Sequence, residues 1–165
     1  HVRIDYPDAE SEQSILALAR RVAVTATQLN TSEAKSTQGS LGMPSPVSQK
    51  ELFAARREVL AVHMAENIEK YLLEIVISTR NPKPYGNDLV QWIEYGASPR
   101  ASIALDRCAR AHAWLDGRDY VEPDDIQRMA YDVLRHRVLL TYEAEAEGVS
   151  ADRFIQELLN RIAVP

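Results

Sequence analysis

The stretch EYGASPRASIAL, residues 94–105, places a cation where a helix is expected to begin. Ser98 is a preferred N-cap residue and Pro99 suits the first helical position, so the pattern predicts a helix that starts at Pro99. The amino end of a helix carries about half a positive charge and disfavours Arg100 there by about 0.3–1 kcal/mol. A guanidinium at such an end can bind an anion, and phosphate is the natural ligand.

Arg100 is therefore the first candidate for a binding residue. The alternative is that Arg100 is a surface residue, which extends into water or pairs with Glu94 or Asp88.

Other residues that could do chemistry lack the partners they would need. Cys108 and His112 stand one helical turn apart and could be two metal ligands, but no further Cys or His completes a set, so we interpret them as a buried core pair and predict no metal site. His63 and His136 are isolated in the sequence. The acids of TYEAEAEG (Glu143, Glu145, Glu147) are typical of a solvated or ion-paired face. There is no GxxxxGK[ST] loop and no nucleophile motif, so we expect no complete enzyme in this chain alone.

Composition excludes several classes of partner. The 165 residues include 19 basic and 24 acidic side chains, a net charge of −5, which disfavours binding to nucleic acid. A single cysteine excludes an internal disulfide and suits a reducing compartment, and no apolar run approaches the ~20 residues that span a bilayer. We therefore predict a cytoplasmic protein without membrane contact. The chain begins with His1, which suggests a fragment or a trimmed protein.

The first part of the chain divides into two predicted units. Val2, Ile4 and Tyr6 alternate as in a strand, and Asp8 can cap a helix that ends near Thr27. The expected inward face of that helix is Ile15, Leu18, Ala19 and Val22. Residues 29–47 are rich in Ser, Thr, Gly, Pro and Gln, which predicts a mobile linker. The predicted organisation is thus a first unit at 1–28, a linker at 29–47 and a helical unit at 48–165.

The unit at 48–165 is predicted to be a bundle of amphipathic helices. Ser48 to Glu51 is a capping box, and Pro82 and Gly117 mark helix ends. The expected inward residues are Leu52, Ala55 and Val59 in the first helix and Ile68, Leu72, Ile75 and Val76 in the second. The arginine-bearing helix should have a narrow face of Ala101, Ala104, Cys108 and Ala111, flanked by Leu105, His112 and Leu115.

The remaining segments complete a mainly α chain. DLVQWIEYG is predicted to be a short helix, and VLLTY a short strand or an extended turn. Glu122 occupies the N-cap position of the helix that begins at Pro123, where it is a weak cap, so that start is expected to depend on Asp124 and Asp125.

The run from YGASPRASIALDRCARAHAWL through GRDYVEPDD and VLRHR to TYEAEAEGV closely resembles the C-terminal part of MoxR-type AAA+ ATPases, and RIDYPDAESEQSIL resembles their last core strand and following helix. The resemblance implies a helical AAA+ lid at 48–165, with 1–28 as a remnant of the α/β ATPase core. It also implies that Arg100 is the sensor 2 arginine, which together with Ser98 binds the phosphates of ATP. The departures are Glu122, where the family usually has Thr or Ser, and the loosely constrained linker.

The same resemblance implies further properties of a longer protein. These are ATP hydrolysis with Mg²⁺, Walker motifs and an arginine finger ahead of residue 1, and chaperone-like remodelling or activation of partner complexes. Implied partners are the AAA+ core of the same chain, a homo-oligomeric ring and proteins with von Willebrand A domains. One alternative is a stand-alone helical interaction module in which Arg100 binds an acidic partner. Another is the lid of a magnesium-chelatase subunit, although the HRVLLTYEAEAEG tail favours MoxR.

Overall fold

The computed structural model describes residues 7–29 and 46–165. Its elements are α1 (Ala9–Leu29), α2 (Gln49–Ala61), α3 (Glu66–Arg80), a 3-10 turn η1 (Lys83–Tyr85), α4 (Asn87–Trp92), β1 (Ile93–Tyr95), α5 (Pro99–Leu115), α6 (Pro123–Leu134), β2 (Leu139–Leu140), α7 (Tyr142–Ala146) and α8 (Ala151–Arg161). This mainly helical composition confirms the predicted fold class. The strand predicted from Val2, Ile4 and Tyr6 lies outside the described residues, as does most of the predicted linker.

Helix α1 begins as predicted but buries a different face. The Ser11 N–H donates to Asp8 Oδ1 at 2.8 Å, which is the expected N-cap. Ile15 and Leu18 are 36% and 54% exposed, whereas Glu12 and Leu16 are each 1% exposed. The predicted inward face is therefore wrong at Ile15 and Leu18, because the helix turns a charged residue toward the body of the protein; the side chain of Val22 lies outside the described part.

Helices α2 and α3 form over the predicted segments, with unequal burial, and α2 packs mainly on α1 and α5 rather than on α3. The capping box of Ser48 and Glu51 is present, and α3 buries Ile68, Leu72, Ile75 and Val76 as expected. Helix α2 has no buried residue, and its Leu52 is 52% exposed. The predicted inward stripe of α2 is thus only half covered, since α2 lies at the end of the molecule.

A two-stranded antiparallel sheet replaces the end of the predicted DLVQWIEYG helix. Helix α4 ends at Trp92, and β1 then pairs with β2 in the register Ile93↔Leu140 and Tyr95↔Leu139. The prediction of a strand within VLLTY is confirmed. The prediction of a helix through Ile93 was wrong. Ile93 pairs with Leu140, which lies more than forty residues further along the chain and gives no signal in the local sequence.

Helix α5 runs through the core and packs most extensively on α6. Its buried face is Ala101, Leu105, Ala109 and Ala113, each with no exposed surface. The buried face differs by about one position from the predicted narrow face. Cys108, predicted to lie on that face, is only half-buried, and Leu115, predicted to flank it, is 75% exposed. Small residues on this face still let α6 approach closely, as expected. Gly117 ends the helix with φ +75°, which confirms that stop signal.

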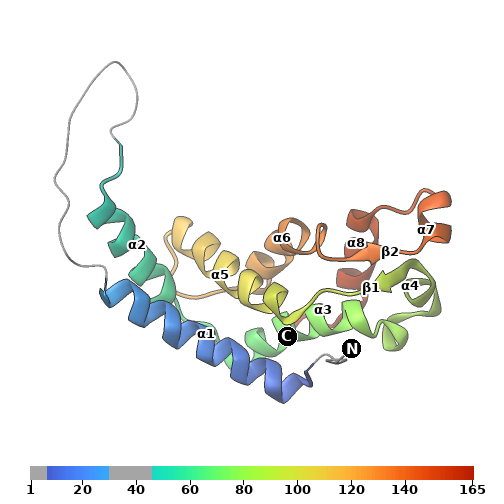
Figure 1. Cartoon of the computed structure of the whole chain (residues 1–165), viewed down its shortest axis with the longest axis horizontal. Helices are drawn as coiled ribbons and strands as arrows, with labels where there is room; N and C mark the ends of the chain where they lie inside the picture. Colours follow the sequence, from blue (N-terminus) through green and yellow to red (C-terminus); the bar gives the residue numbers. More distant parts are fainter. Residues whose placement is uncertain (1–6, 30–45) are drawn as a thin grey trace, which may run out of the picture.

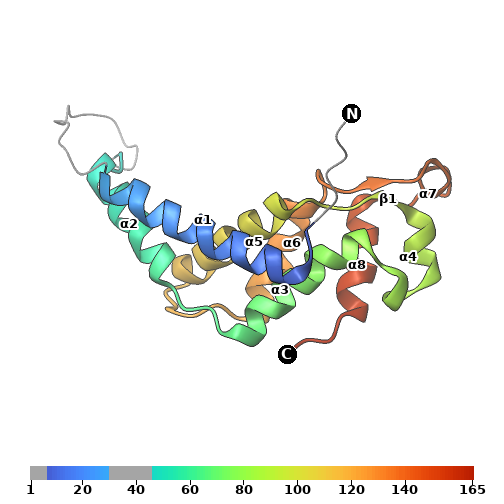
Figure 2. The same ribbon diagram turned by 60° about the horizontal axis from the view of Figure 1, so that its bottom comes forward.

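The elements form an elongated body, with α2 at one end and α4 and α7 at the other (Figure 1). Helix α1 lies along α3 and α5, as both views show (Figure 2). A continuous apolar core joins α3, α5, α6 and α8, with Phe154, Ile155 and Leu158 of α8 fully buried. Among the described residues, no helix is both long enough and apolar enough to cross a membrane.

Candidate functional site

Arg100 lies in the first turn of α5, as predicted, with its side chain exposed. Within the described residues, no carboxylate or other acceptor pairs with its guanidinium. Asp88, one of the two acids considered as a partner, binds Arg161 instead at 2.6 Å. The surroundings therefore leave the charge of Arg100 uncompensated at a helix end that repels it.

Ser98 has the backbone of an N-cap residue but does not cap with its side chain. Its φ of −77° and ψ of 169° are extended, and Pro99 follows at the first helical position. The Ser98 carbonyl accepts the Ala101 N–H at 2.8 Å, while the hydroxyl makes no capping hydrogen bond. The expected capping role of the Ser98 side chain is thus wrong, and the hydroxyl stays at a helix end where N–H groups need acceptors.

The segment before α5 is fixed to the end of α3. Thr79 is buried, accepts the Ala97 N–H on Oγ1 at 2.9 Å and donates to the Val76 carbonyl at 2.7 Å. A Cβ atom on Gly96 would lie 2.4 Å from the Thr79 carbonyl oxygen, so only glycine fits this approach. The start of α5, and with it Arg100, is held against α3 by backbone contact.

A buried carboxylate from α1 also holds this region. Glu12 accepts hydrogen bonds from Arg80 at the end of α3 and from the Ser102 hydroxyl in α5, the latter at 3.3 Å. Glu12 and Ser102 are 1% and 2% exposed. Such a buried charge is tolerated only when it is paired and hydrogen-bonded. Glu12 therefore joins α1, α3 and α5 within two residues of Arg100.

A second buried ionic cluster lies one to three turns further along α5. The Asp106 carboxylate is 1% exposed and accepts a hydrogen bond from Arg110 Nε at 2.9 Å. It also accepts a hydrogen bond from Arg20 of α1. Arg20 also forms an ion pair with Glu69 of α3 at 2.9 Å. Burial lowers the pKa of Arg20, but Asp106 and Glu69 outweigh it and raise the pKa overall. These contacts make α1, α3 and α5 one connected unit.

Cys108 and His112 do not form the buried core pair that we predicted. The His112 Nδ1 lies 2.6 Å from Asp125 Oδ1, and Arg118 donates to both Asp125 oxygens at 2.6 and 2.7 Å. Burial is the main influence on Cys108, and it raises the pKa of that thiol. His112, Asp116 and Asp125 bring ligand atoms within 4.8 Å of one another, but the Arg118 guanidinium already supplies the positive charge there.

Asp125 also explains how α6 starts with Glu122 at its N-cap position. The Asp125 carboxylate accepts the Glu122 N–H at 2.8 Å, so an acid of the first turn completes the cap, as expected. Burial raises the pKa of Asp125, but hydrogen bonds from Arg118, the Glu122 N–H and His112 hold it at about 2.

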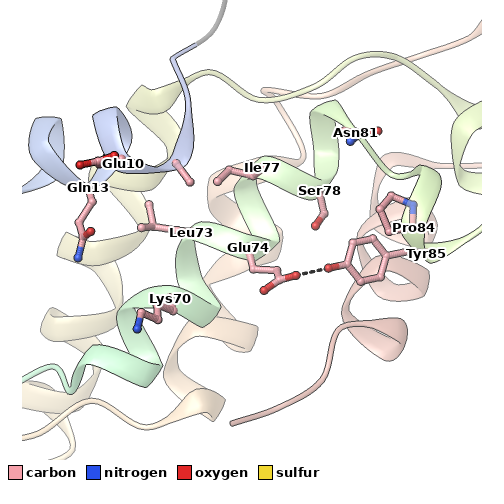
Figure 3. A pocket seen from close by; sticks show the side chains of 11 residues that line it. Glu10, Gln13, Lys70, Leu73, Glu74, Ile77, Ser78, Asn81, Pro84 and Tyr85 are labelled. Carbon is pink, nitrogen blue, oxygen red and sulfur yellow. Dashed lines mark hydrogen bonds between the residues drawn. The ribbon is translucent and has the colours of Figure 1, made fainter.

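An open groove of about 560 Å³ runs between the start of α1 and the outer face of α3 (Figure 3). Leu73 and Ile77 line it beside Glu74, whose carboxylate is bonded by the Tyr85 hydroxyl. Neither Ser98 nor Arg100 lines this groove.

The sequence singled out Arg100 and Ser98 as candidates but not the residues that hold the start of α5 in place. Glu12 shares a helical stripe with Leu16, and a charged residue on a buried stripe is the signal that could have revealed it. Asp106 and Arg110 stand four positions apart on α5 and were readable as a pair. Thr79 and Gly96 gave no signal, because their roles depend on contact between distant segments.

The AAA lid domain family matches residues 91–158. Chaperone MoxR1 of Mycobacterium tuberculosis is 44% identical over 96 residues, which are 58% of this chain and 26% of that protein. The uncharacterized protein YeaC of Bacillus subtilis is 41% identical over 121 residues, 73% of this chain and 35% of that protein. The chain thus spans about a quarter to a third of the length of these relatives.

A solved structure is similar over almost the whole chain. It is the crystal structure of a candidate ATPase from Cytophaga hutchinsonii, with 36% sequence identity and a TM-score of 0.70. The similarity covers 99% of this chain and 46% of that one.

Proposed function

This chain carries an AAA lid domain and is related to the MoxR-type AAA+ ATPases, and on that premise we propose that it is the lid of an ATPase whose nucleotide binds against the start of α5. The observation that carries the proposal is the exposed guanidinium of Arg100, which has no acidic partner among the described residues. A helix end with free N–H groups and an added cation fits an anion with several charges.

Arg100 and Ser98 are the residues that we assign to the phosphates. The planar guanidinium of Arg100 can bridge two phosphate oxygens, and the Ser98 hydroxyl can donate a third hydrogen bond. ATP with Mg²⁺ supplies the transferable phosphoryl group, and by family resemblance the AAA+ core of a longer polypeptide holds most of it. Arg100 stabilises charge on the terminal phosphate, and its contact ends when that phosphate leaves.

Loss of this contact lets the lid angle follow the state of the nucleotide. The domain assignment that suits this function is a core remnant at 1–28, a linker at 29–47 and the lid at 48–165. The paired Glu12 and Arg20 support transmission, because they join α1 to the lid helices α3 and α5. Motion at the start of α1 would then reach Arg100 through buried ion pairs.

The wider role that we assign follows the relatives. The longer protein would act as a cytoplasmic, chaperone-like ATPase in a homo-oligomeric ring and would remodel or activate partner complexes, including proteins with von Willebrand A domains. Nucleic acid is not among the expected partners, given the net charge of −5, and neither is a membrane.

The test compares the 165-residue chain with the longer polypeptide that contains the core. We expect ATP turnover by the longer polypeptide and none by the chain alone, since the residues that hold Mg²⁺ and most phosphate contacts lie in the core. Partners should be captured differently with and without a non-hydrolysable ATP analogue. Steady hydrolysis by the clean 165-residue chain, or a longer polypeptide without turnover, contradicts the proposal.

A further inference from the structure

A cleft of about 350 Å³ lies between α4 and α7, at the end of the molecule farthest from α2 (Figure 1). Its lining residues are Gln91, Trp92, Glu143, Ala144 and Glu147. Thr141 fixes its shape, since its N–H donates to the Trp92 carbonyl at 2.9 Å and its hydroxyl to the Gln91 carbonyl at 2.7 Å. These two hydrogen bonds tie the start of α7 to the end of α4.

The cleft carries negative charge that its surroundings do not neutralise. Glu143 and Glu147 are exposed and stand four residues apart, where like charges repel. In the described part of the chain, neither glutamate forms an ion pair. The base found beside the cleft is Arg153, whose guanidinium lies 5.3 Å from the centre of the Trp92 ring. The Trp92 ring therefore already carries a cation of this chain, and the two unpaired carboxylates are the groups that can bind a guanidinium or ammonium group from another molecule.

Exposed apolar side chains are present on β1, β2 and α7, the elements that follow or precede the cleft residues in the chain. Tyr142 is 82% exposed, and the register partners Tyr95 and Leu139 are 59% and 52% exposed. Exposed apolar side chains next to unpaired charges are typical of a surface that binds another protein. The expected partner segment therefore combines basic and apolar residues.

Helix α2 has that combination. Lys50, Arg56 and Arg57 are exposed, and Arg56 lies over Phe53 at 5.9 Å from the ring centre. Neither Lys50 nor Arg57 forms an ion pair with a residue that the structure describes. Helical spacing brings these bases to one face with Phe53 and the exposed Leu52.

The acids of α2 are already engaged. Glu51 accepts the Ser48 N–H at 2.7 Å, and Glu58 accepts the Trp114 indole N–H at 3.0 Å. The unpaired charge of α2 is therefore positive. Because α2 and α7 lie at opposite ends in both views, the two surfaces of one molecule cannot meet (Figures 1 and 2).

We infer that the α4–α7 cleft binds the basic face of α2 from a second copy of this chain, with Arg56 or Arg57 between Glu143 and Glu147. Such a head-to-tail contact joins two different surfaces, so it extends into a closed ring when the rotation between copies permits. The inference rests on the proposed function for its setting, where it would be one contact of the homo-oligomeric ring. The pairing of the two surfaces needs no nucleotide.

The test uses sedimentation velocity on the 165-residue chain over a range of concentration and salt. We expect association that strengthens with concentration and weakens as salt screens the charges. In R56E/R57E both ends become acidic, and in E143K/E147K both become basic, so neither variant should associate alone. Mixed in equal amounts, they should associate at least tenfold more tightly than either does with itself, because each end again meets its opposite.

The matched control is R107E/R128E, which changes net charge as much as R56E/R57E at exposed positions of α5 and α6 that belong neither to α2 nor to the lining of the cleft. It should associate like the wild type, and circular dichroism should show that all variants fold. A wild-type chain that stays monomeric in low salt, or a mixture no tighter than its components, overturns the inference, as does binding of another basic protein without self-association. ATP hydrolysis does not enter this test, so hydrolysis without self-association overturns the contact and leaves the proposed function standing.

Discussion

The Ser102 hydroxyl donates to the Glu12 carboxylate at 3.3 Å, although the two residues are 90 positions apart in the chain. This bond joins α1 to the first turns of α5, and both side chains are buried. Glu12 also accepts a hydrogen bond from Arg80 of α3. One carboxylate therefore connects α1, α3 and α5 close to the start of α5, where Arg100 lies.

The Ser102→Ala variant tests whether this bond positions Arg100. Loss of one buried hydrogen bond should cost about 0.5–1.5 kcal/mol of unfolding free energy, and Glu12 keeps Arg80 as its partner. In the longer polypeptide we expect kcat for ATP hydrolysis to fall about two- to tenfold, with a smaller change in KM, since small displacements of a charge donor reduce the rate. Ser78→Ala, at a serine that is 3% exposed in α3, is the matched control and should leave kcat unchanged. Equal kcat in both variants would make the Glu12–Ser102 bond purely structural.

Arg100→Ala should separate turnover from stability. We expect kcat to fall roughly ten- to a thousandfold, as when one preorganised charge donor is lost. Stability of the free protein should be unchanged or higher by about 0.3–1 kcal/mol, because the cation leaves an unfavourable helix end. Lysine should restore little, since it lacks the planar fork. Arg107→Ala, at an exposed arginine further along α5, is the control for both measurements. Strong destabilisation with intact turnover would show that Arg100 is a structural ion-pair residue.

Gly96→Ala should destabilise the protein by about 1–3 kcal/mol, because the added Cβ meets backbone that cannot move aside. That atom would lie 2.4 Å from the Thr79 carbonyl oxygen. Urea denaturation measures the cost. Ser98→Ala is the informative comparison, since a capping serine usually contributes about 1 kcal/mol but this hydroxyl makes no capping bond. A near-neutral Gly96→Ala, or a costly Ser98→Ala, contradicts the described geometry.

Stability should fall in acid through Asp125. Its pKa of about 2 in the folded protein lies below the ordinary value of 3.8, so its pairing stabilises the fold above about pH 4 and this contribution is lost as pH falls toward 2. The loss should be of the order of 2 kcal/mol for this buried carboxyl. Asp125→Asn should be less stable at pH 7 and should show a flatter dependence between pH 4 and pH 2. Asp124→Asn, at the exposed neighbour, should retain the wild-type slope; identical slopes in all three proteins would rule out this origin.

The sequence by itself determined where most helices begin and end. The Ser48 and Glu51 capping box, Pro99 at the start of α5 and Gly117 at its end act over at most four residues, so local spacing was sufficient to predict them. The exposed position of Arg100 at a helix start was equally readable, because it depends on the same local signals.

Only the tertiary structure decided which faces are buried and which polar groups meet. Ile15 and Leu18 looked like the inward face of α1, but Glu12 turns inward because Arg80, 68 positions away, supplies its charge partner. Ile93 leaves α4 to pair with Leu140 for a similar reason. A charged side chain can be buried at low cost in free energy only when a partner of opposite charge lies beside it. A strand forms only when a second strand lies beside it to complete its hydrogen bonds. The physical cause of both is contact between segments far apart in the chain, which local periodicity does not encode.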